Sequence, residues 1–569
     1  MNGKDAAWQA GVDASEVLGP ESTLFARFDP GDFGLSVIAV LARAAAHPAD
    51  AMAAWLRFAG AIGRAGPAAV STWLGANAGR PAADRADRRF ADRAWADNPA
   101  YSTLLAGYMA ARQLAGDLLA AGRGEPLSDQ KAELAVHFAL DAVAPSNFLL
   151  TNPVALKRAF ETGGASVLAG ARNFVDDLVH NGGRPRQVDT TPFQLGRNLA
   201  ATPGSVVFRN DLIELIQYRP QRKRVREVPL LASPPWINKY YVMDLAPGRS
   251  FLEWAVKHRR TVFAISYRNP DASMSQVTLD DYLLHGPIAA MDVIADITGS
   301  PKVDIVGLCL GGALTAMLAA YLAQTGDSRL GSLTLLNTLL DYSEPGVLGA
   351  FADPQTIARL EAQMGREGVM SGTKMAATFD VLRANDLIFN YVVSNWLMGQ
   401  RPPAFDILAW NADSTRLPAA MHSFYLHSLY EQNLLAKGEL KLAGQSLSLA
   451  DIQRDTYLVG AVNDHIVPWM SSYKSTRLLG GPVRYVLSSG GHIAGIVNPP
   501  SQKAWYRAGD RHPEQPAQWR DAAEQHAGSW WEDWTQWANA RAGRLIAPPP
   551  TGSERFPALG PAPGGYVRD

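Results

Sequence analysis

The feature that most constrains the fold is an uncharged run of 22 residues, 305–326, which contains Gly-Leu-Cys-Leu-Gly at positions 307–311. β-branched residues lead into this run and glycines crowd its first part, a pattern typical of a buried strand, a tight turn and a buried helix. By length alone the run could also span a bilayer. Asp304 and Asp327 close its two ends, and together with the glycines they favour the strand, turn and helix.

The turn within this run has the pattern of a nucleophile elbow, G-x-S-x-G, with Cys309 in the place of the serine. In an elbow the nucleophile lies on a sharp turn between a strand and a helix. Gly307 and Gly311 would leave room for the helix to pack against the strand. The helix N-terminus favours a thiolate and supplies a backbone N–H. The alternative is a buried cysteine that serves as a small apolar residue. The two flanking glycines favour the nucleophile.

An acid and a histidine follow Cys309 in the chain order of the α/β-hydrolases. Asp464 and His492 each come directly after a short strand-like run, at 456–462 and 484–488. Either residue alone could be a polar loop residue, but in this order they predict a Cys–His–Asp triad.

A second histidine competes for the role of base. His465 directly follows Asp464, so its ring cannot easily reach both that carboxylate and the sulfur. His492 is therefore the predicted base.

An oxyanion hole requires two backbone N–H groups directed at the developing charge. Leu310 follows the nucleophile and supplies one of them. The other should come from the loop after an earlier strand, where Pro234 and Pro235 have no N–H to donate. The donor is then Trp236 or Ile237, of which we choose Ile237. The alternative is that this loop is a plain structural turn.

Composition limits the function. There are 53 Lys and Arg against 54 Asp and Glu, a net charge of −1, which argues against nucleic-acid binding. The single cysteine excludes an intramolecular disulfide, and no HExxH or similar spacing predicts a metal site. The first residues lack a charged-then-apolar signal, so we expect a cytoplasmic protein with no transmembrane segment.

Strand-like and helix-like segments alternate from about residue 200, which predicts an α/β-hydrolase fold: a mostly parallel sheet with flanking helices. The strands at 332–340 and 456–462 are separated by far more chain than a crossover needs, so an inserted cap should lie over Cys309.

Asn98-Pro99 predicts a helix start and Gly122 its end. Trp530, Trp534 and Trp537 lie at helical spacing and indicate core packing. The predicted domains are a helical N-terminal domain, 1–195, with a variable part, 1–97, and a charged, solvated linker, 83–97; a first core part, 196–341; the cap or lid, 342–454; a second core part, 455–545; and a Pro- and Gly-rich tail, 546–569.

The chain also resembles a known family, the polyhydroxyalkanoate synthases, over most of its length. The resemblance rests on these stretches: NPAYSTLLAGYM (98–109), NFLLTNP (147–153), TPGSVVFRNDLIELIQY (202–218), PPWINKYYVMDLAPGRSF (234–251), SYRNPDAS (266–273), GLCLGG (307–312), WNADSTRLP (410–418), NDHIVPW (463–469), SGGHIAGIVNPP (489–500), GSWWEDW (528–534) and PAPGGYV (561–567). The family's catalytic cysteine, aspartate and histidine match Cys309, Asp464 and His492. The chain length and the local sequence of these stretches resemble the single-subunit, class I type.

The resemblance implies an acyltransferase that polymerises (R)-3-hydroxyacyl-CoA, such as 3-hydroxybutyryl-CoA, with release of CoA through a cysteine thioester. It implies no cofactor, because CoA is part of the substrate. The implied partners are the growing polyester, the polymer granule in the cytoplasm, a second copy of the chain and granule-coating proteins. Trp410 lies in a segment associated with dimer contacts, and the alternative is an aromatic residue in the core of the cap.

Two other functions remain open. A thioesterase or depolymerase could use the same triad, because the fold does not decide whether water or an alcohol attacks the acyl-enzyme. A catalytically silent protein of the granule surface is the third possibility, and the complete triad argues against it.

Overall fold

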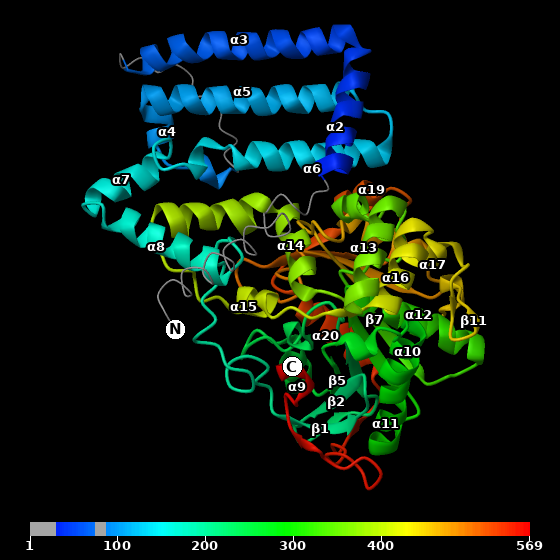
Figure 1. Ribbon diagram of the computed structural model, residues 1–569. Helices are drawn as coiled ribbons and strands as arrows, with labels where there is room; N and C mark the ends of the chain where they lie inside the picture. Colours follow the sequence, from blue (N-terminus) through cyan, green and yellow to red (C-terminus); the bar gives the residue numbers. More distant parts are fainter. Residues whose placement is uncertain (1–29, 74–86) are drawn as a thin grey trace. The chain divides into compact units, whose positions relative to one another are not determined.

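The computed structural model describes residues 30–73 and 87–569, and the chain divides into two compact units (Figure 1). One unit comprises the described residues up to Asp189 together with Ala377–Ala404. The other comprises Thr190–Ala376 and Phe405–Asp569. The segment 377–404 lies inside the region expected as a cap, yet it belongs to the same unit as the N-terminal helices.

The N-terminal unit is helical. Its long helices contact one another in pairs, α3 with α5 and α2 with α6. Its elements are α2 (Pro30–Ala45), α3 (Pro48–Trp73), the 3₁₀ turn η1 (Arg88–Phe90), α4 (Ala94–Asp97), α5 (Pro99–Ala121), α6 (Pro126–Ala142), α7 (Pro153–Glu161), α8 (Ala165–His180) and the π-helical turns η7 (Asn385–Phe389) and η8 (Val392–Leu397).

Helix α5 begins and ends where the sequence predicts. The Asn98 side chain accepts hydrogen bonds from the backbone N–H groups of Ala100 and Tyr101, at 2.9 and 3.4 Å, and Pro99 is the first helical residue. Gly122 follows the last turn, and a Cβ there would lie 2.1 Å from the Val40 carbonyl oxygen. The predicted helix start and end are confirmed.

The charged segment before α5 is not solvated as expected. Residues 83–86 lie outside the described part of the chain, but from residue 87 onward the segment folds into η1 and α4. Phe90 and Trp95 are buried against Leu105 and Tyr108 of α5. The prediction of a linker is wrong for this described part, because the aromatic residues between the charges form a small core.

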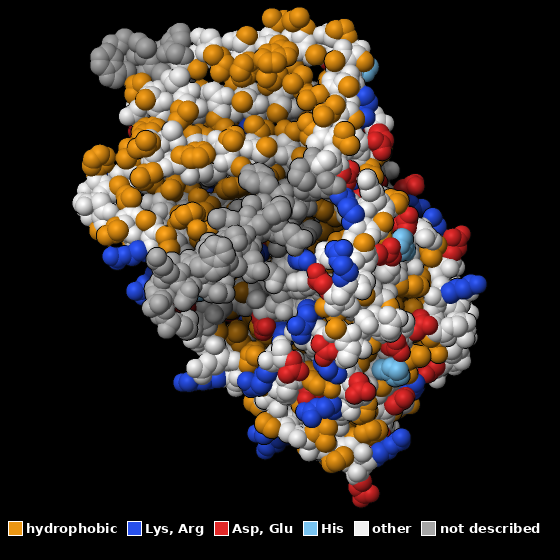
Figure 2. Space-filling view, viewed as in Figure 1, with side chains coloured by type: hydrophobic (Ala, Val, Ile, Leu, Met, Phe, Trp, Pro, Cys, Tyr) orange, Lys and Arg blue, Asp and Glu red, His pale blue; other side chains and the backbone are white. Residues whose placement is uncertain are grey.

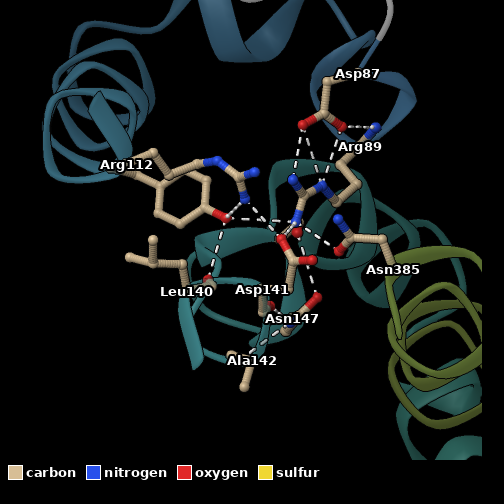
Figure 3. Close-up of polar contacts among 10 residues, drawn as sticks. Asp87, Arg89, Arg112, Leu140, Asp141, Ala142, Asn147 and Asn385 are labelled. Atoms are coloured by element: carbon tan, nitrogen blue, oxygen red, sulfur yellow. Dashed lines mark hydrogen bonds and ion pairs between the residues drawn. The ribbon is translucent and has the colours of Figure 1, made fainter. Parts of the chain in front are cut away.

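Two charges of this segment, Asp87 and Arg89, are paired (Figure 3). The Arg89 guanidinium donates to Asp87 at 2.8 Å, to Asp141 of α6 at 3.2 Å and to the Asn385 amide oxygen of η7 at 2.7 Å. Arg112 of α5 donates to Asp141 at 2.6 Å. Arg89 therefore joins the N-terminal helices to segment 377–404 within this unit.

Exposed apolar side chains gather on the N-terminal unit (Figure 2). Helices α2 and α3 expose Leu35, Ile38, Met52, Trp55 and Leu56. Groups of this kind are typical of a surface that contacts an apolar partner. Among the described residues, no single helix has the length and apolarity to cross a bilayer. Only α2 with the first part of α3 would qualify jointly, and they are bent by 101° at their junction.

The second unit is built on one large sheet, fully within the described residues 190–569. Its strand order is β15-β14-β13-β12-β7-β6-β4-β5-β2-β1-β17. The strands are β1 (Gly204–Arg209), β2 (Ile213–Tyr218), β4 (Leu230–Ser233), β5 (Val262–Tyr267), β6 (Val303–Leu308), β7 (Leu330–Leu336), β12 (Thr456–Ala461), β13 (Val483–Ser488), β14 (Trp505–Gly509), β15 (Glu524–Ala527) and β17 (Gly560–Pro561). The strands from β5 to β13 run parallel, and both flanks of the sheet are antiparallel.

Helices flank this sheet and fill the long connection between β7 and β12. These two strands are parallel neighbours, so the connection is an insertion between adjacent strands. Outside the insertion lie α9 (Phe251–Lys257), α10 (Leu279–Leu283), α11 (Ala289–Thr298), α12 (Leu310–Thr325), α18 (Trp469–Lys474), α19 (Pro516–Ala522) and α20 (Trp530–Arg541). Inside it lie α13 (Pro354–Glu367), α14 (Gly372–Leu382), α15 (Asp406–Ala412), α16 (Ala419–Tyr425), α17 (Leu434–Lys437) and the strand pairs β8 (Val369–Met370) with β9 (Leu417–Pro418) and β10 (Lys441–Leu442) with β11 (Gln445–Ser446).

The uncharged run 305–326 is buried in this unit as β6, a turn and α12. All six residues of β6 and 12 of the 16 residues of α12 are buried. Strands and helices covered on every side are expected to be apolar throughout. The strand, turn and helix predicted from the sequence are confirmed.

The Arg89 pairing yields a prediction for the N-terminal unit. We expect Arg89→Ala to lower its free energy of unfolding by about 3 kcal/mol, because the largely buried Asp87 loses its cation and Asp141 keeps only Arg112. Urea unfolding monitored by limited proteolysis would measure the loss. Arg88→Ala removes the exposed neighbouring arginine and should change stability by less than about 0.5 kcal/mol. Equal losses of stability in the two variants would contradict a stabilising role for the Arg89 ion pairs.

Candidate functional site

The predicted nucleophile lies between β6 and α12 at the carboxyl end of the parallel strands. Cys309 has φ 53° and ψ −119°, in the region of positive φ that side-chain-bearing residues rarely adopt. Its backbone N–H donates to the Leu336 carbonyl at the end of β7, at 2.8 Å. This bond holds the strained residue in place.

Three glycines make room for the turn. A Cβ on Gly307 would lie 2.5 Å from the Thr315 hydroxyl oxygen. A Cβ on Gly311 would lie 2.2 Å from the Ser233 carbonyl oxygen of β4. Gly312, which the elbow pattern does not include, would bring its Cβ to 1.9 Å from a side-chain atom of Thr338. Side chains at these positions would separate α12 from the sheet.

Asp464 and His492 meet on the loops after β12 and β13. These two loops bring His492 Nδ1 to 2.7 Å from Asp464 Oδ2, and both residues are buried. The other carboxylate oxygen accepts the backbone N–H groups of Ile466 and Val467, each at 2.9 Å. The carboxylate is thus oriented by its own loop, with one oxygen left for the imidazole.

The three predicted triad residues interact with one another. Burial acts to lower the pKa of His492, but the charges of Asp464 and Cys309 and their hydrogen bonds to the ring outweigh it, so the pKa lies well above its usual range. The arrangement therefore favours the protonated form of the His492 imidazole.

The loop that carries Ile237 begins next to the elbow, since a Cβ on Gly311 would lie 2.4 Å from the Pro234 carbonyl oxygen. Among the described residues, none accepts a hydrogen bond from the backbone N–H of Leu310 or of Ile237. The peptide units on either side of Ile237 are held by one hydroxyl group. Thr415 Oγ1 donates to the Trp236 carbonyl at 3.0 Å and accepts the Asn238 N–H at 2.8 Å.

Trp410 reaches the same loop from α15. Its side chain is buried, and its Nε1–H donates to the Lys239 carbonyl at 2.8 Å. This geometry agrees with an aromatic residue packed within the chain. The contact with a second protomer stays a prediction.

Two groups of residues that support the site were not identified as functional from the sequence. Thr415 belongs to the WNADSTRLP stretch, but no local pattern marks a hydroxyl that binds a distant loop. Trp530 and Trp531 donate their indole N–H groups to the Gly495 and Ile496 carbonyls, both at 2.9 Å, and so hold the loop that carries His492. Core packing is confirmed for Trp530 and also for Trp534, whereas Trp537 is half-buried.

The fold and the site define the class of the protein. The sheet is mainly parallel, an elbow follows β6, and an Asp–His pair follows β12 and β13. This is the arrangement of the α/β-hydrolases. Residues 236–499 match the family described as alpha/beta hydrolase fold. In residues 30–73 and 87–569, no cluster of three or more potential metal ligands occurs.

Relatives then identify the family within this class. Residues 86–255 match the family described as Poly-beta-hydroxybutyrate polymerase (PhaC) N-terminus. The chain is 42% identical over 490 residues to the poly(3-hydroxyalkanoate) polymerase subunit PhaC of Cupriavidus necator, covering 85% of this chain and 83% of the relative. It is 41% identical to the poly(3-hydroxyalkanoate) polymerase of Methylorubrum extorquens, covering 85% and 80%. For polymerase 1 of Ectopseudomonas oleovorans the identity is 40%, covering 87% and 88%. The chain belongs to the poly(3-hydroxyalkanoate) polymerase family.

The crowding at the elbow yields a prediction. We expect Gly311→Ala to lower the free energy of unfolding by about 3 kcal/mol, because its Cβ would collide with backbone that cannot move independently. Gly365→Ala in α13 is the matched control, since a Cβ there meets no atom within 4 Å, and it should stabilise the helix by up to about 1 kcal/mol. Calorimetric unfolding of both variants measures the difference. A Gly311→Ala protein as stable as the unmodified chain would contradict the packing argument.

Proposed function

We propose that the protein polymerises (R)-3-hydroxyacyl-CoA into polyhydroxyalkanoate and releases CoA, through a thioester on Cys309. The observation that carries the proposal is the geometry of the triad. A strained cysteine on an elbow raises the pKa of His492 together with Asp464, whose carboxylate orients the ring at 2.7 Å. The similarity to polymerases over most of the chain supports the same reaction.

In the first proposed step the acyl group moves to the enzyme. His492 takes the thiol proton, and the Cys309 sulfur attacks the acyl-CoA carbonyl carbon. The backbone N–H groups of Leu310 and Ile237 stabilise the oxyanion. The bond from the carbonyl carbon to the CoA sulfur then breaks, and CoA leaves with the proton from His492. One thioester replaces another, so loading is close to isoenergetic and does not trap the enzyme.

In the second proposed step the polymer grows. A 3-hydroxyl group, of the next unit or of the growing chain, attacks the enzyme thioester while His492 accepts its proton. An ester bond forms, the bond to the Cys309 sulfur breaks, and the sulfur recovers a proton from His492. An alcohol is much less acidic than a thiol, so this step depends more strongly on the base.

The remaining expectations belong to this proposal. We propose a preference for short acyl chains, a cap role for the insertion 342–454 and a cap contact for Trp410. We also propose a homodimer and association with polymer granules in the cytoplasm. The exposed apolar side chains of α2 and α3 would suit contact with a polyester surface. No cofactor enters either step.

One assay separates this proposal from its alternatives. The protein is incubated with (R)-3-hydroxybutyryl-CoA, and both free CoA and turbidity are followed. CoA with polymer supports the polymerase, CoA with free acid indicates a thioesterase or depolymerase, and neither product indicates a silent granule protein. Cys309→Ala is the control and should release no CoA. Longer 3-hydroxyacyl-CoA substrates then test the chain-length preference.

Asp464→Asn should separate the two steps. An asparagine can still accept the Ile466 and Val467 N–H groups, but it would present an amide N–H to His492 Nδ1 and favour the wrong tautomer. A cysteine beside an imidazole needs little further activation, whereas the hydroxyl must lose its proton as it attacks. We expect a burst of about one CoA per site, followed by elongation at least ~10²-fold slower.

Rapid-quench measurement of CoA and polymer distinguishes the phases for the Asn variant. His492→Ala should lose both phases. If the Asn variant shows no burst and an equally slow second phase, Asp464 only orients His492.

Thr415→Val should slow both steps. Valine has nearly the shape of threonine but cannot bind the Trp236 carbonyl or the Asn238 N–H, so the peptide that carries the Ile237 N–H loses its support. We expect burst and elongation rates to fall together by about tenfold, less than the ~10²-fold typical of losing an oxyanion donor itself. Thr415→Ser keeps the hydroxyl and should retain most of the activity. Unchanged rates in the Val variant would argue against Ile237 as a donor.

A further inference from the structure

The end of β7 contacts the backbone of the elbow, of strand β12 and of the loop that carries His492. The Leu336 carbonyl accepts the Cys309 N–H at 2.8 Å. The next residue, Asn337, donates its own N–H to the Val459 carbonyl of β12 at 2.7 Å, in the strand that leads to Asp464. The Asn337 side chain donates Nδ2–H to the His492 carbonyl at 2.5 Å. Leu336 and Asn337 thus link the elbow, strand β12 and the loop of His492.

Asn337 is an unusual residue for a strand end in the core. Its exposed fraction is 0%, and its φ of 43° lies in the left-handed region that asparagine tolerates better than most residues. Among the described residues, no group donates a hydrogen bond to its amide oxygen. Burying an amide with one half unpaired is unfavourable. The turn alone therefore does not explain why this residue is asparagine, because glycine would adopt the same φ without a buried polar group.

We infer that Asn337 is a positioning residue that fixes the main chain of His492 relative to Cys309. The inference rests on the proposed roles of Cys309 and His492. The Asp464 bond holds only the Nδ1 side of the imidazole. The loop itself contains Gly490, with φ 109°, and Gly491. The carbonyls of these two glycines accept the N–H groups of Asn463 and Gly495, at 2.9 and 2.7 Å, and the Asn337 bond adds a contact at His492 itself.

The His492 carbonyl is the point at which β7 holds this loop. Asn337 binds it from β7, while Trp530 binds the Gly495 carbonyl three residues further on. With its main chain and its Nδ1 both held, the ring keeps its other nitrogen directed at the sulfur. Loss of the Asn337 bond would let the ring move away from the sulfur, so the imidazole would activate the thiol less well.

The single cysteine of the chain allows a test that does not depend on polymer formation. The full chain is alkylated with iodoacetamide across a range of pH, and modification of Cys309 is followed by mass spectrometry. Asn337→Gly removes the amide donor and suits the positive φ. His492→Ala marks the effect of losing the base entirely. Circular dichroism and thermal unfolding of each variant report its fold.

Asn539→Ala is the matched control. This residue also donates Nδ2–H to a histidine carbonyl, that of His258 at 3.3 Å, and its buried amide oxygen also has no partner among the described residues. It lies near the C-terminal end of α20, and its side-chain bond is to His258 and not to a triad loop. Its loss should leave the alkylation profile within about twofold of the unmodified chain, as for a surface-like change away from the site.

In the Asn337→Gly variant we expect Cys309 to be alkylated at least about tenfold more slowly at neutral pH. This loss is part of the ~10²-fold that a base contributes. The alkylation rate should also rise at a higher pH than in the unmodified chain. If Asn337→Gly does not fold, Asn337→Asp keeps the shape without the donor and should show the same shift. A folded variant with lowered thermal stability but an unchanged pH profile overturns the inference. Slow alkylation with no polymer in the unmodified chain would instead count against the proposed function, because the two readouts are independent.

Discussion

The strained backbone of Cys309 is the constraint on which the rest of the catalytic unit depends. A residue at φ 53° persists only where its surroundings hold it, and here the Leu336 carbonyl and the close approach of α12 to β4 do so. Gly311 and Gly312 permit this approach, since a Cβ at either position would overlap the neighbouring strand ends. The same crowding shapes the turn that carries both the predicted nucleophile, Cys309, and the predicted oxyanion donor, Leu310. Both predicted roles therefore depend on one packing arrangement.

The insertion between β7 and β12 belongs to two units at once. Its middle part, 377–404, is bound to the N-terminal helices by several side-chain to backbone bonds. Arg158 donates to the Met398 carbonyl at 2.8 Å, Gln187 to the Leu387 carbonyl at 2.7 Å and Asn173 to the Asn395 carbonyl at 3.0 Å. The outer parts, including Thr415, belong to the unit of the triad. Unfolding of the N-terminal helices would thus release a segment that is covalently continuous with Thr415, which binds the loop of Trp236.

Much of the site could be predicted because its chemistry leaves local patterns. The elbow requires small residues at fixed spacing around Cys309, and an acid and a histidine after later strands follow from the order of the sheet. The segment from Asp87 to Asp97 was misjudged because its charge density suggests solvent, whereas Phe90 and Trp95 supply enough apolar surface for a small core and Arg89 finds carboxylates on other helices. The division of the insertion was not predictable either. Chain length between strands shows that residues are inserted, but not which neighbours they bind.

The contacts that left no pattern are those that hold the site from a distance. Thr415, Asn337 and Trp530 each bind a backbone carbonyl in another segment, and such a bond constrains neither residue's own secondary structure. Any residue with a donor of the right length could serve, so type and spacing carry little information. The reacting groups are different, because their own chemistry limits the choice to a few residue types. A sequence therefore reveals the groups that react more readily than the groups that place them, and the second set emerges only when the buried polar atoms are each traced to a partner.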